Sequence, residues 1–63
     1  MDYKSLLMII GADTKVKLAY NHQSGFFYQG TIKDAPPVKG DLEIVSMYIY
    51  EGEDALTIVL EEA

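Results

Sequence analysis

The residues that could support nucleophilic catalysis are few and lie far apart in the chain. His22 is the single histidine, and Ser24 or Ser46 would have to lie beside it together with an orienting carboxylate. His22 occurs in the polar stretch 21–25, which ends in glycine and is typical of a turn. Because the spacing groups no nucleophile with a base, we predict no catalytic residues, and an enzyme is the least favoured function class.

Metal, cofactor and phosphate sites are not predicted either. The carboxylates that would have to supply a metal site are Asp13, Asp34, Asp41 and Glu43. They form no EF-hand loop, no histidine-rich spacing accompanies them, and the absence of cysteine removes thiolate ligands. Gly25 and Gly30 bracket a predicted strand and do not precede a helix, so they are not a phosphate-binding loop.

The charge balance argues against nucleic acid and membranes as partners. The chain has five lysines, no arginine and ten carboxylates, for a net charge of -5. Proteins that bind nucleic acid or anionic lipid neutralise phosphates with clustered lysine and arginine, which is the opposite balance. The longest apolar run, residues 6–10, is also too short to span a bilayer or to form a secretory signal. We therefore expect a cytoplasmic protein.

Size favours association with another chain. The 63 residues are predicted to form one domain, 1–63, and a domain of this length buries only about 60% of the surface that its unfolded chain exposes. No disulfide can supplement the core, since cysteine is absent. With 49% hydrophobic residues, we expect a homo-oligomer or a complex with another protein.

The first ten residues predict a short helix over about 3–10. Tyr3, Leu6, Leu7 and Ile10 recur at helical spacing. Asp2 can serve as the N-cap and Gly11 as the left-handed residue after the helix. The alternative is a buried strand over 6–10, because short apolar runs fit both structures.

Beyond residue 11 the apolar period changes to two, which predicts strands at about 14–20, 26–32, 42–51 and 55–61. The fold class is therefore mainly β (α+β): a short N-terminal helix followed by a four- to five-stranded antiparallel sheet. That sheet is either strongly bent or closed into a small SH3- or Sm-like barrel. The prolines at 36 and 37 predict a stiff connection between the second and third strands.

Alternation along 26–32 assigns the aromatic residues of this strand to two faces. Phe26, Tyr28 and Ile32 are expected in the core, and Phe27 is expected outside. Gly30 in mid-strand predicts a bend or bulge.

The third predicted strand is apolar on both faces, with Val45, Met47 and Ile49 on one side. The residues that we predict to form an aromatic-rich interface are Phe27, Ile44, Tyr48, Tyr50 and Val59. Three explanations are open for the second apolar face: the N-terminal helix covers it, a partner covers it, or a strongly bent strand in a small barrel uses both faces internally.

Two resemblances carry weak motifs. The helix, the strand with Val16 and Leu18, the turn at Gly25 and the pattern Tyr28-x-Gly30-x-Ile32 resemble the Sm-like small barrel. That family places an Asp four residues after the position of Ile32, then Met-Asn, and later an Arg-Gly pair that holds RNA. Here Asp34 comes two residues after Ile32 and arginine is absent, so the resemblance implies a fold without RNA binding.

The second resemblance is to small uncharacterised proteins of phages and mobile elements of Gram-positive bacteria. It rests on Lys4-x-Leu6-Leu7-x-x-Ile10, on Thr14-Lys15-Val16-x-Leu18 and on Val45-Ser46. It implies a genomic setting and no chemistry.

Taken together, these features predict a non-enzymatic protein–protein interaction or assembly module that self-associates. The alternative is an acidic decoy that occupies the basic groove of a nucleic-acid-handling protein. Its support is a cluster of carboxylates around two loops: Asp34, Asp41, Glu43, Glu51, Glu53 and Asp54.

Overall fold

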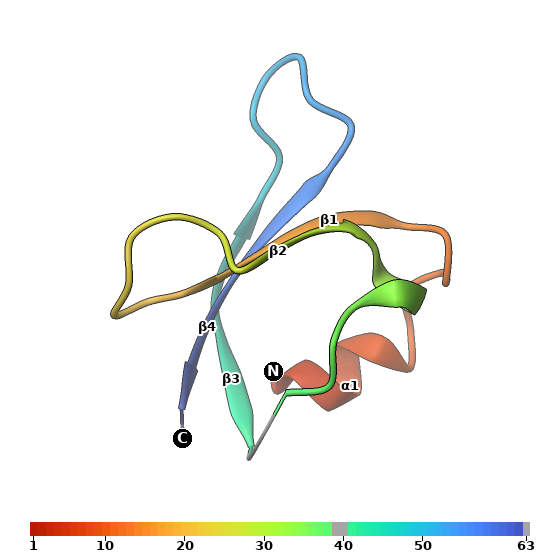
Figure 1. The fold of residues 1–63 in the computed structure, drawn as a ribbon. Coiled ribbons are helices and arrows are strands. Elements are labelled where there is room, and N and C mark those ends of the chain that lie inside the picture. The colour runs from red at the N-terminus through yellow and green to blue at the C-terminus, as the bar shows by residue number, and fades with distance from the viewer. Residues whose placement is uncertain (39–40, 63) are drawn as a thin grey trace.

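A computed structural model describes residues 1–38 and 41–62. The elements in chain order are the helix α1 (Tyr3–Leu7), strands β1 (Lys15–Tyr20) and β2 (Tyr28–Thr31), the 3-10 helix η1 (Ile32–Asp34), and strands β3 (Leu42–Tyr48) and β4 (Leu56–Glu62). Figure 1 shows β1 and β2 crossing β3 and β4 at a steep angle, so the sheet is strongly bent. The predicted class, a mainly β fold with a short N-terminal helix, is confirmed.

The sheet is mixed and open, whereas the sequence predicted antiparallel pairing throughout. Its strand order is β2-β1-β4-β3, with β1 and β4 parallel and the two outer pairs antiparallel. After β2 the chain passes through η1 to the far edge of the sheet, and β4 then returns beside β1. Of the two predicted forms, the open bent sheet is observed and the closed barrel is not.

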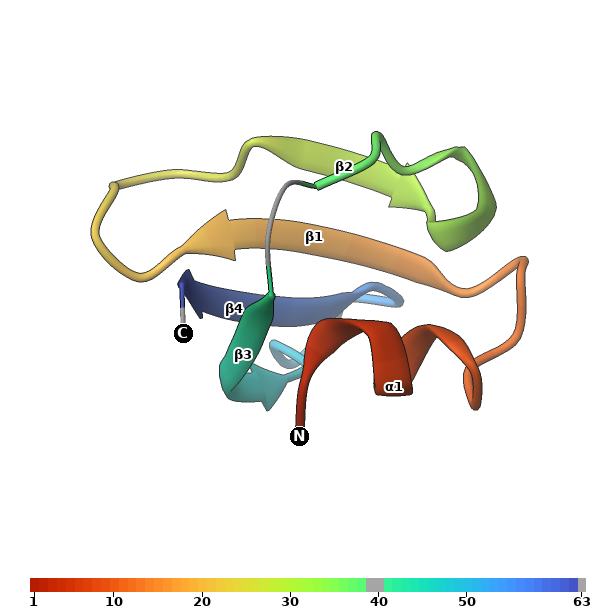
Figure 2. The same cartoon turned by 90° about the horizontal axis from the view of Figure 1, so that it is seen from below.

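The core lies on the face of the sheet that α1 covers (Figure 2). On β1 the buried residues Val16 and Leu18 alternate with lysines, as the period of two predicts. In register beside them, Leu18 lies opposite Ile58 on the parallel strand β4, and both side chains are fully buried. The centre of the core therefore consists of two strands that are more than thirty residues apart in the sequence.

The N-terminal helix is confirmed, and the alternative strand over 6–10 is wrong. Asp2 caps the helix by accepting a hydrogen bond from the Ser5 backbone N–H at 2.7 Å. The predicted C-terminal signal is wrong, because the helix already ends at Leu7 with Met8 as the C-cap. Gly11 is not among the glycines with positive φ.

The Asp2 cap predicts a pH dependence of stability. Hydrogen bonds from the Ser5 side chain and backbone lower the pKa of Asp2 below 3.8. A carboxylate whose pKa is lowered by folding stabilises the fold above its unfolded pKa and loses this contribution as the pH falls. In thermal melts we expect Asp2→Asn, which keeps a capping oxygen, to be less stable than wild type at about pH 7. We expect the difference to shrink as the pH falls from about 4 towards 2. A constant difference over that range would show that the charge of Asp2 contributes nothing.

The stretch before β2 reverses the predicted sides of two phenylalanines. Phe27 packs against the core and stacks on Tyr20 with ring centroids 4.4 Å apart. Phe26 is exposed, with the Lys17 ammonium 5.4 Å from its ring centre. The prediction assumed a strand from residue 26, but β2 begins at Tyr28, so the alternation does not extend to Phe26 and Phe27.

Gly30 is required for a different reason than the predicted bulge. The β1–β2 register runs without a shift through Gly30, and the irregularity of the sheet lies instead in β3, between Ile44 and Ser46. The Tyr28 side chain folds over Gly30 and donates a hydrogen bond to the Thr31 carbonyl at 2.6 Å. A side chain at position 30 would meet the Tyr28 hydroxyl.

Candidate interaction surface

The five predicted interface residues do not form one patch. Phe27 and Ile44 are half-buried and pack against the core. Val59 is half-buried on the central strand β4, where Ser46 lies opposite it. Tyr48 and Tyr50 are the two that are largely exposed, at 39% and 50% of their surface.

The two tyrosines belong to a larger apolar surface on the edge of the sheet. We call it the β3 surface and define it by the exposed side chains Val45, Met47, Tyr48, Ile49 and Tyr50. Met47 lies opposite Ile58, and Tyr48 lies opposite Thr57. Ile58 and Thr57 are neighbours on β4 and therefore point to opposite faces of the sheet. Met47 and Tyr48, which lie opposite them, also point to opposite faces, so the β3 surface is apolar on both sides of the sheet.

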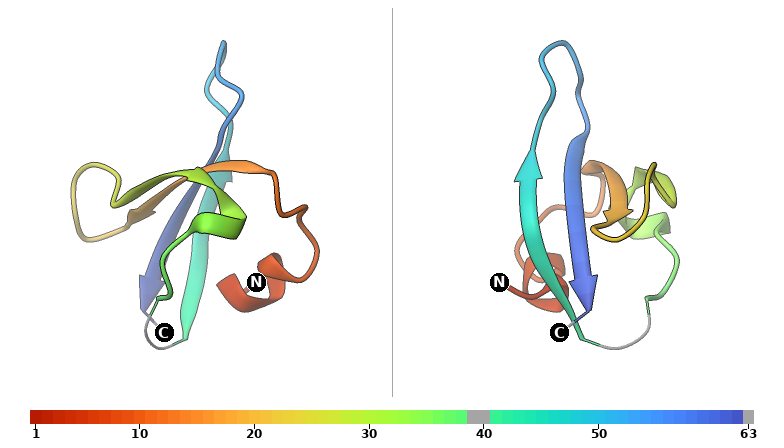
Figure 3. Two further views of the ribbon diagram at one scale, coloured as in Figure 1. Left: turned by 45° about the vertical axis from the view of Figure 1, so that its right-hand side comes forward. Right: turned by 90° about the vertical axis from the view of Figure 1, so that its left-hand side faces the viewer.

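The position of the β3–β4 hairpin explains why both sides are exposed. Figure 3 shows the hairpin extending beyond the other elements, with α1 near the opposite end of β3. At that end the Ile44 backbone N–H donates to the Met1 carbonyl, and Asp2 forms a bridge with Glu43. Within the described residues, the N-terminal segment therefore covers the beginning of β3 and leaves Val45 onwards open.

Tyr48 and Tyr50 are ordered against each other. Their rings meet edge to face with centroids 5.0 Å apart, and their hydroxyl oxygens are 3.3 Å apart in a hydrogen bond. That hydrogen bond, with smaller contributions from desolvation and from the charge of Tyr50, raises the pKa of Tyr48. The pair therefore offers an ordered aromatic surface, and aromatic residues are enriched at protein interfaces.

The sequence prediction missed three members of the β3 surface. Simple alternation assigned Val45, Met47 and Ile49 to one apolar face of the strand and left them out of the predicted interface. The bulge between Ile44 and Ser46 disturbs that alternation. The hairpin extends beyond the other elements, so α1 does not cover these side chains. A signal was present in the sequence: residues 44–50 are seven consecutive uncharged residues with high β propensity and no proline.

The carboxylate cluster behind the decoy alternative is partly neutralised. Lysines pair with three of its six members: Lys4 with Asp41, Lys15 with Asp54 and Lys17 with Glu53. The Nζ–oxygen distances are 3.8, 2.7 and 2.5 Å. A protein that imitates nucleic acid needs carboxylates without cationic partners, so these ion pairs weaken the support for a decoy.

The structure brings together no set of histidine and carboxylate side chains among the described residues that would form a metal site. His22 lies 5.6 Å from the Tyr20 ring, centre to centre, in the turn after β1. Over residues 1–38 and 41–62, no three histidine or carboxylate side chains gather closely enough to hold a metal ion. In the same residues, no helix has the length and apolarity needed to cross a membrane.

Comparisons with known proteins leave both sequence resemblances as predictions. No protein family, curated protein or solved structure matches the chain.

Proposed function

We propose that the protein is a non-enzymatic assembly module that self-associates through the β3 surface. One observation carries the proposal: an uncharged segment, residues 44–50, exposes five large apolar side chains on the edge strand β3 and on the two residues that follow it. An edge strand offers unpaired backbone groups to another strand, and native proteins normally protect such edges with charge or cover. Between Val45 and Tyr50 this edge carries no charged residue.

A second copy of the chain fits this surface better than a charged partner does. Pairing two β3 strands about a twofold axis would place uncharged residues against uncharged residues and aromatic side chains against apolar ones. The charges that flank the segment are both acidic, Glu43 and Glu51. Contacts between two copies must therefore come from apolar burial and backbone pairing, with electrostatic repulsion opposing them.

Light scattering of the full chain at high micromolar concentration tests this proposal. We expect the wild type to show a mass above that of the monomer, and Tyr48→Ser/Tyr50→Ser to approach the monomer mass with an unchanged far-UV spectrum. Met8→Ser/Ile9→Ser is the matched control, because it removes two exposed apolar residues from the other end of the molecule. We expect this control to associate like the wild type.

Salt distinguishes apolar association from association through ion pairs. Because each copy carries a net charge of -5, screening should increase the associated fraction between low and moderate salt. A wild type that remains monomeric at high micromolar concentration, or a tyrosine variant that associates unchanged, would rule out self-association through this surface.

A further inference from the structure

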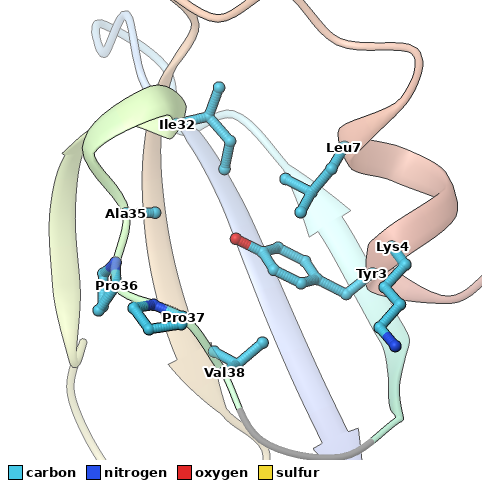
Figure 4. A pocket seen from close by; sticks show the side chains of 8 residues that line it. All are labelled: Tyr3, Lys4, Leu7, Ile32, Ala35, Pro36, Pro37 and Val38. Carbon is cyan, nitrogen blue, oxygen red and sulfur yellow. The ribbon is translucent and has the colours of Figure 1, made fainter.

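A hollow of about 210 Å³ lies between α1 and the segment that follows β2 (Figure 4), and its lining includes no residue of the β3 surface. Its walls include Tyr3, Lys4 and Leu7 from α1 and Ile32, Ala35 and Val38 from the facing segment. Two prolines, Pro36 and Pro37, complete the facing wall and restrict its backbone. The hollow is thus bounded by a capped helix on one side and a stiff segment on the other.

The Tyr3 hydroxyl is a polar group that faces this hollow. The Tyr3 side chain is 3% exposed, and Figure 4 shows its hydroxyl pointing across the hollow towards Ile32 and Ala35. It makes no hydrogen bond to any group within residues 1–38 and 41–62. Burial, with a smaller effect of Tyr28, raises the pKa of Tyr3. The hydroxyl therefore keeps its proton and can donate a hydrogen bond. The hydroxyl is not among the fully buried unpartnered atoms, so water can reach it through the open side of the hollow. A ligand oxygen that enters the hollow can replace that water and accept the hydrogen bond.

The remaining wall favours a neutral, mostly apolar occupant. Among the described residues that line the hollow, Lys4 carries a charge, and its ammonium lies 3.8 Å from the Asp41 carboxylate, which offsets that charge. The other lining side chains are aliphatic or proline, apart from Tyr3. For scale, an apolar cavity of about 150 Å³ holds benzene, so this hollow has room for one six-membered ring with a small substituent.

We propose that the hollow is a binding site for a neutral, ring-sized molecule with one acceptor oxygen, which accepts a hydrogen bond from the Tyr3 hydroxyl. Cyclic ketones have this chemistry: an apolar ring fills the space beside Leu7 and Val38, and the carbonyl oxygen meets the Tyr3 hydroxyl. This site is independent of self-association and uses none of the β3 surface.

Titration of the ¹⁵N-labelled full chain with cyclohexanone and, separately, with benzene tests the site by NMR. We expect cyclohexanone to bind with a dissociation constant on the order of 1 mM and to shift amide signals of α1 and of residues 32–35. Tyr3→Phe removes a hydroxyl that has no protein partner among the described residues, so it should remain folded. It should weaken cyclohexanone binding by about two- to tenfold, the contribution of one hydrogen bond, and leave benzene binding unchanged.

Ala35→Leu provides a second variant that fills the hollow. Ala35 has an extended backbone at φ -64° and ψ 141° and precedes a proline, a conformation that leucine also adopts. This variant should keep a dispersed spectrum and lose binding of both probes. The proposal is overturned if cyclohexanone shifts no amide near the hollow, if Tyr3→Phe binds it as well as the wild type, or if folded Ala35→Leu still binds either probe.

Discussion

Ile58→Ala is expected to lower the melting temperature by roughly 10–30 °C, or to leave the chain unfolded at room temperature. Ile58 is fully buried at the centre of the sheet, where β4 lies between β1 and β3. Truncating a buried isoleucine costs about 2–5 kcal/mol, because the transfer free energy of the removed atoms adds to the cost of the cavity. A domain of 63 residues has a total stability of roughly 3–9 kcal/mol.

Ile9→Ala is the matched control for this experiment. Ile9 has the same side chain but is 69% exposed, just after the C-cap of α1, so its truncation should change stability by less than about 0.5 kcal/mol. Both variants and the wild type should be melted at one protein concentration, because self-association would stabilise the folded state by mass action. If Ile58→Ala and Ile9→Ala melted within a few degrees of each other, the placement of the core on β4 would be wrong.

Gly30→Ala is expected to destabilise the fold by about 1–3 kcal/mol. A Cβ at this position would lie 2.7 Å from the Tyr28 hydroxyl oxygen and 3.2 Å from Cζ of the same ring. The backbone at Gly30 has φ of +155°, which side chains rarely adopt. Relief of the contact would require the Tyr28 ring to move and to give up its hydrogen bond to the Thr31 carbonyl.

Substitutions at two further glycines and one double variant separate the two causes of destabilisation at Gly30, the contact with Tyr28 and the backbone conformation. Gly25→Ala adds a Cβ at φ of +80° with no atom within 4 Å, so it measures the backbone cost alone. Gly11→Ala has neither problem and should be neutral or slightly stabilising. Adding Tyr28→Phe should reduce the cost of Gly30→Ala, because it removes the atom that the new Cβ meets first. If Gly30→Ala destabilised the fold equally with and without Tyr28→Phe, the contact with the Tyr28 hydroxyl would not be the cause, and the backbone conformation would be.

Local structure could largely be predicted from the sequence. The Asp2 cap and the alternation of Val16 and Leu18 with lysines both follow from properties of neighbouring residues. The boundaries were less accurate. Gly11 does not end the helix, and the strand that includes Tyr28 begins two residues later than the pattern predicted. Phe26 and Phe27 were consequently assigned to the wrong sides.

The candidate interface was predicted in part. Apolar residues on both faces of the third strand indicated a second apolar face, and two residues of that face, Tyr48 and Tyr50, are exposed side by side. Phe27 and Ile44 are half-buried against the core, since each lies within reach of elements distant in the sequence. Whether a residue on an alternating strand meets the core depends on what lies over that face, and the strand pattern contains no such information.

The sequence by itself determined the element types, the acidic charge, the absence of cysteine and the uncharged segment at residues 44–50. The tertiary structure alone decided that β4 lies parallel to β1, that the hairpin extends beyond α1, and that the Tyr3 hydroxyl faces a hollow. The physical reason is the range of the interactions. Helix caps and alternation act between neighbouring residues, whereas strand order and exposure follow from how distant segments share one small core.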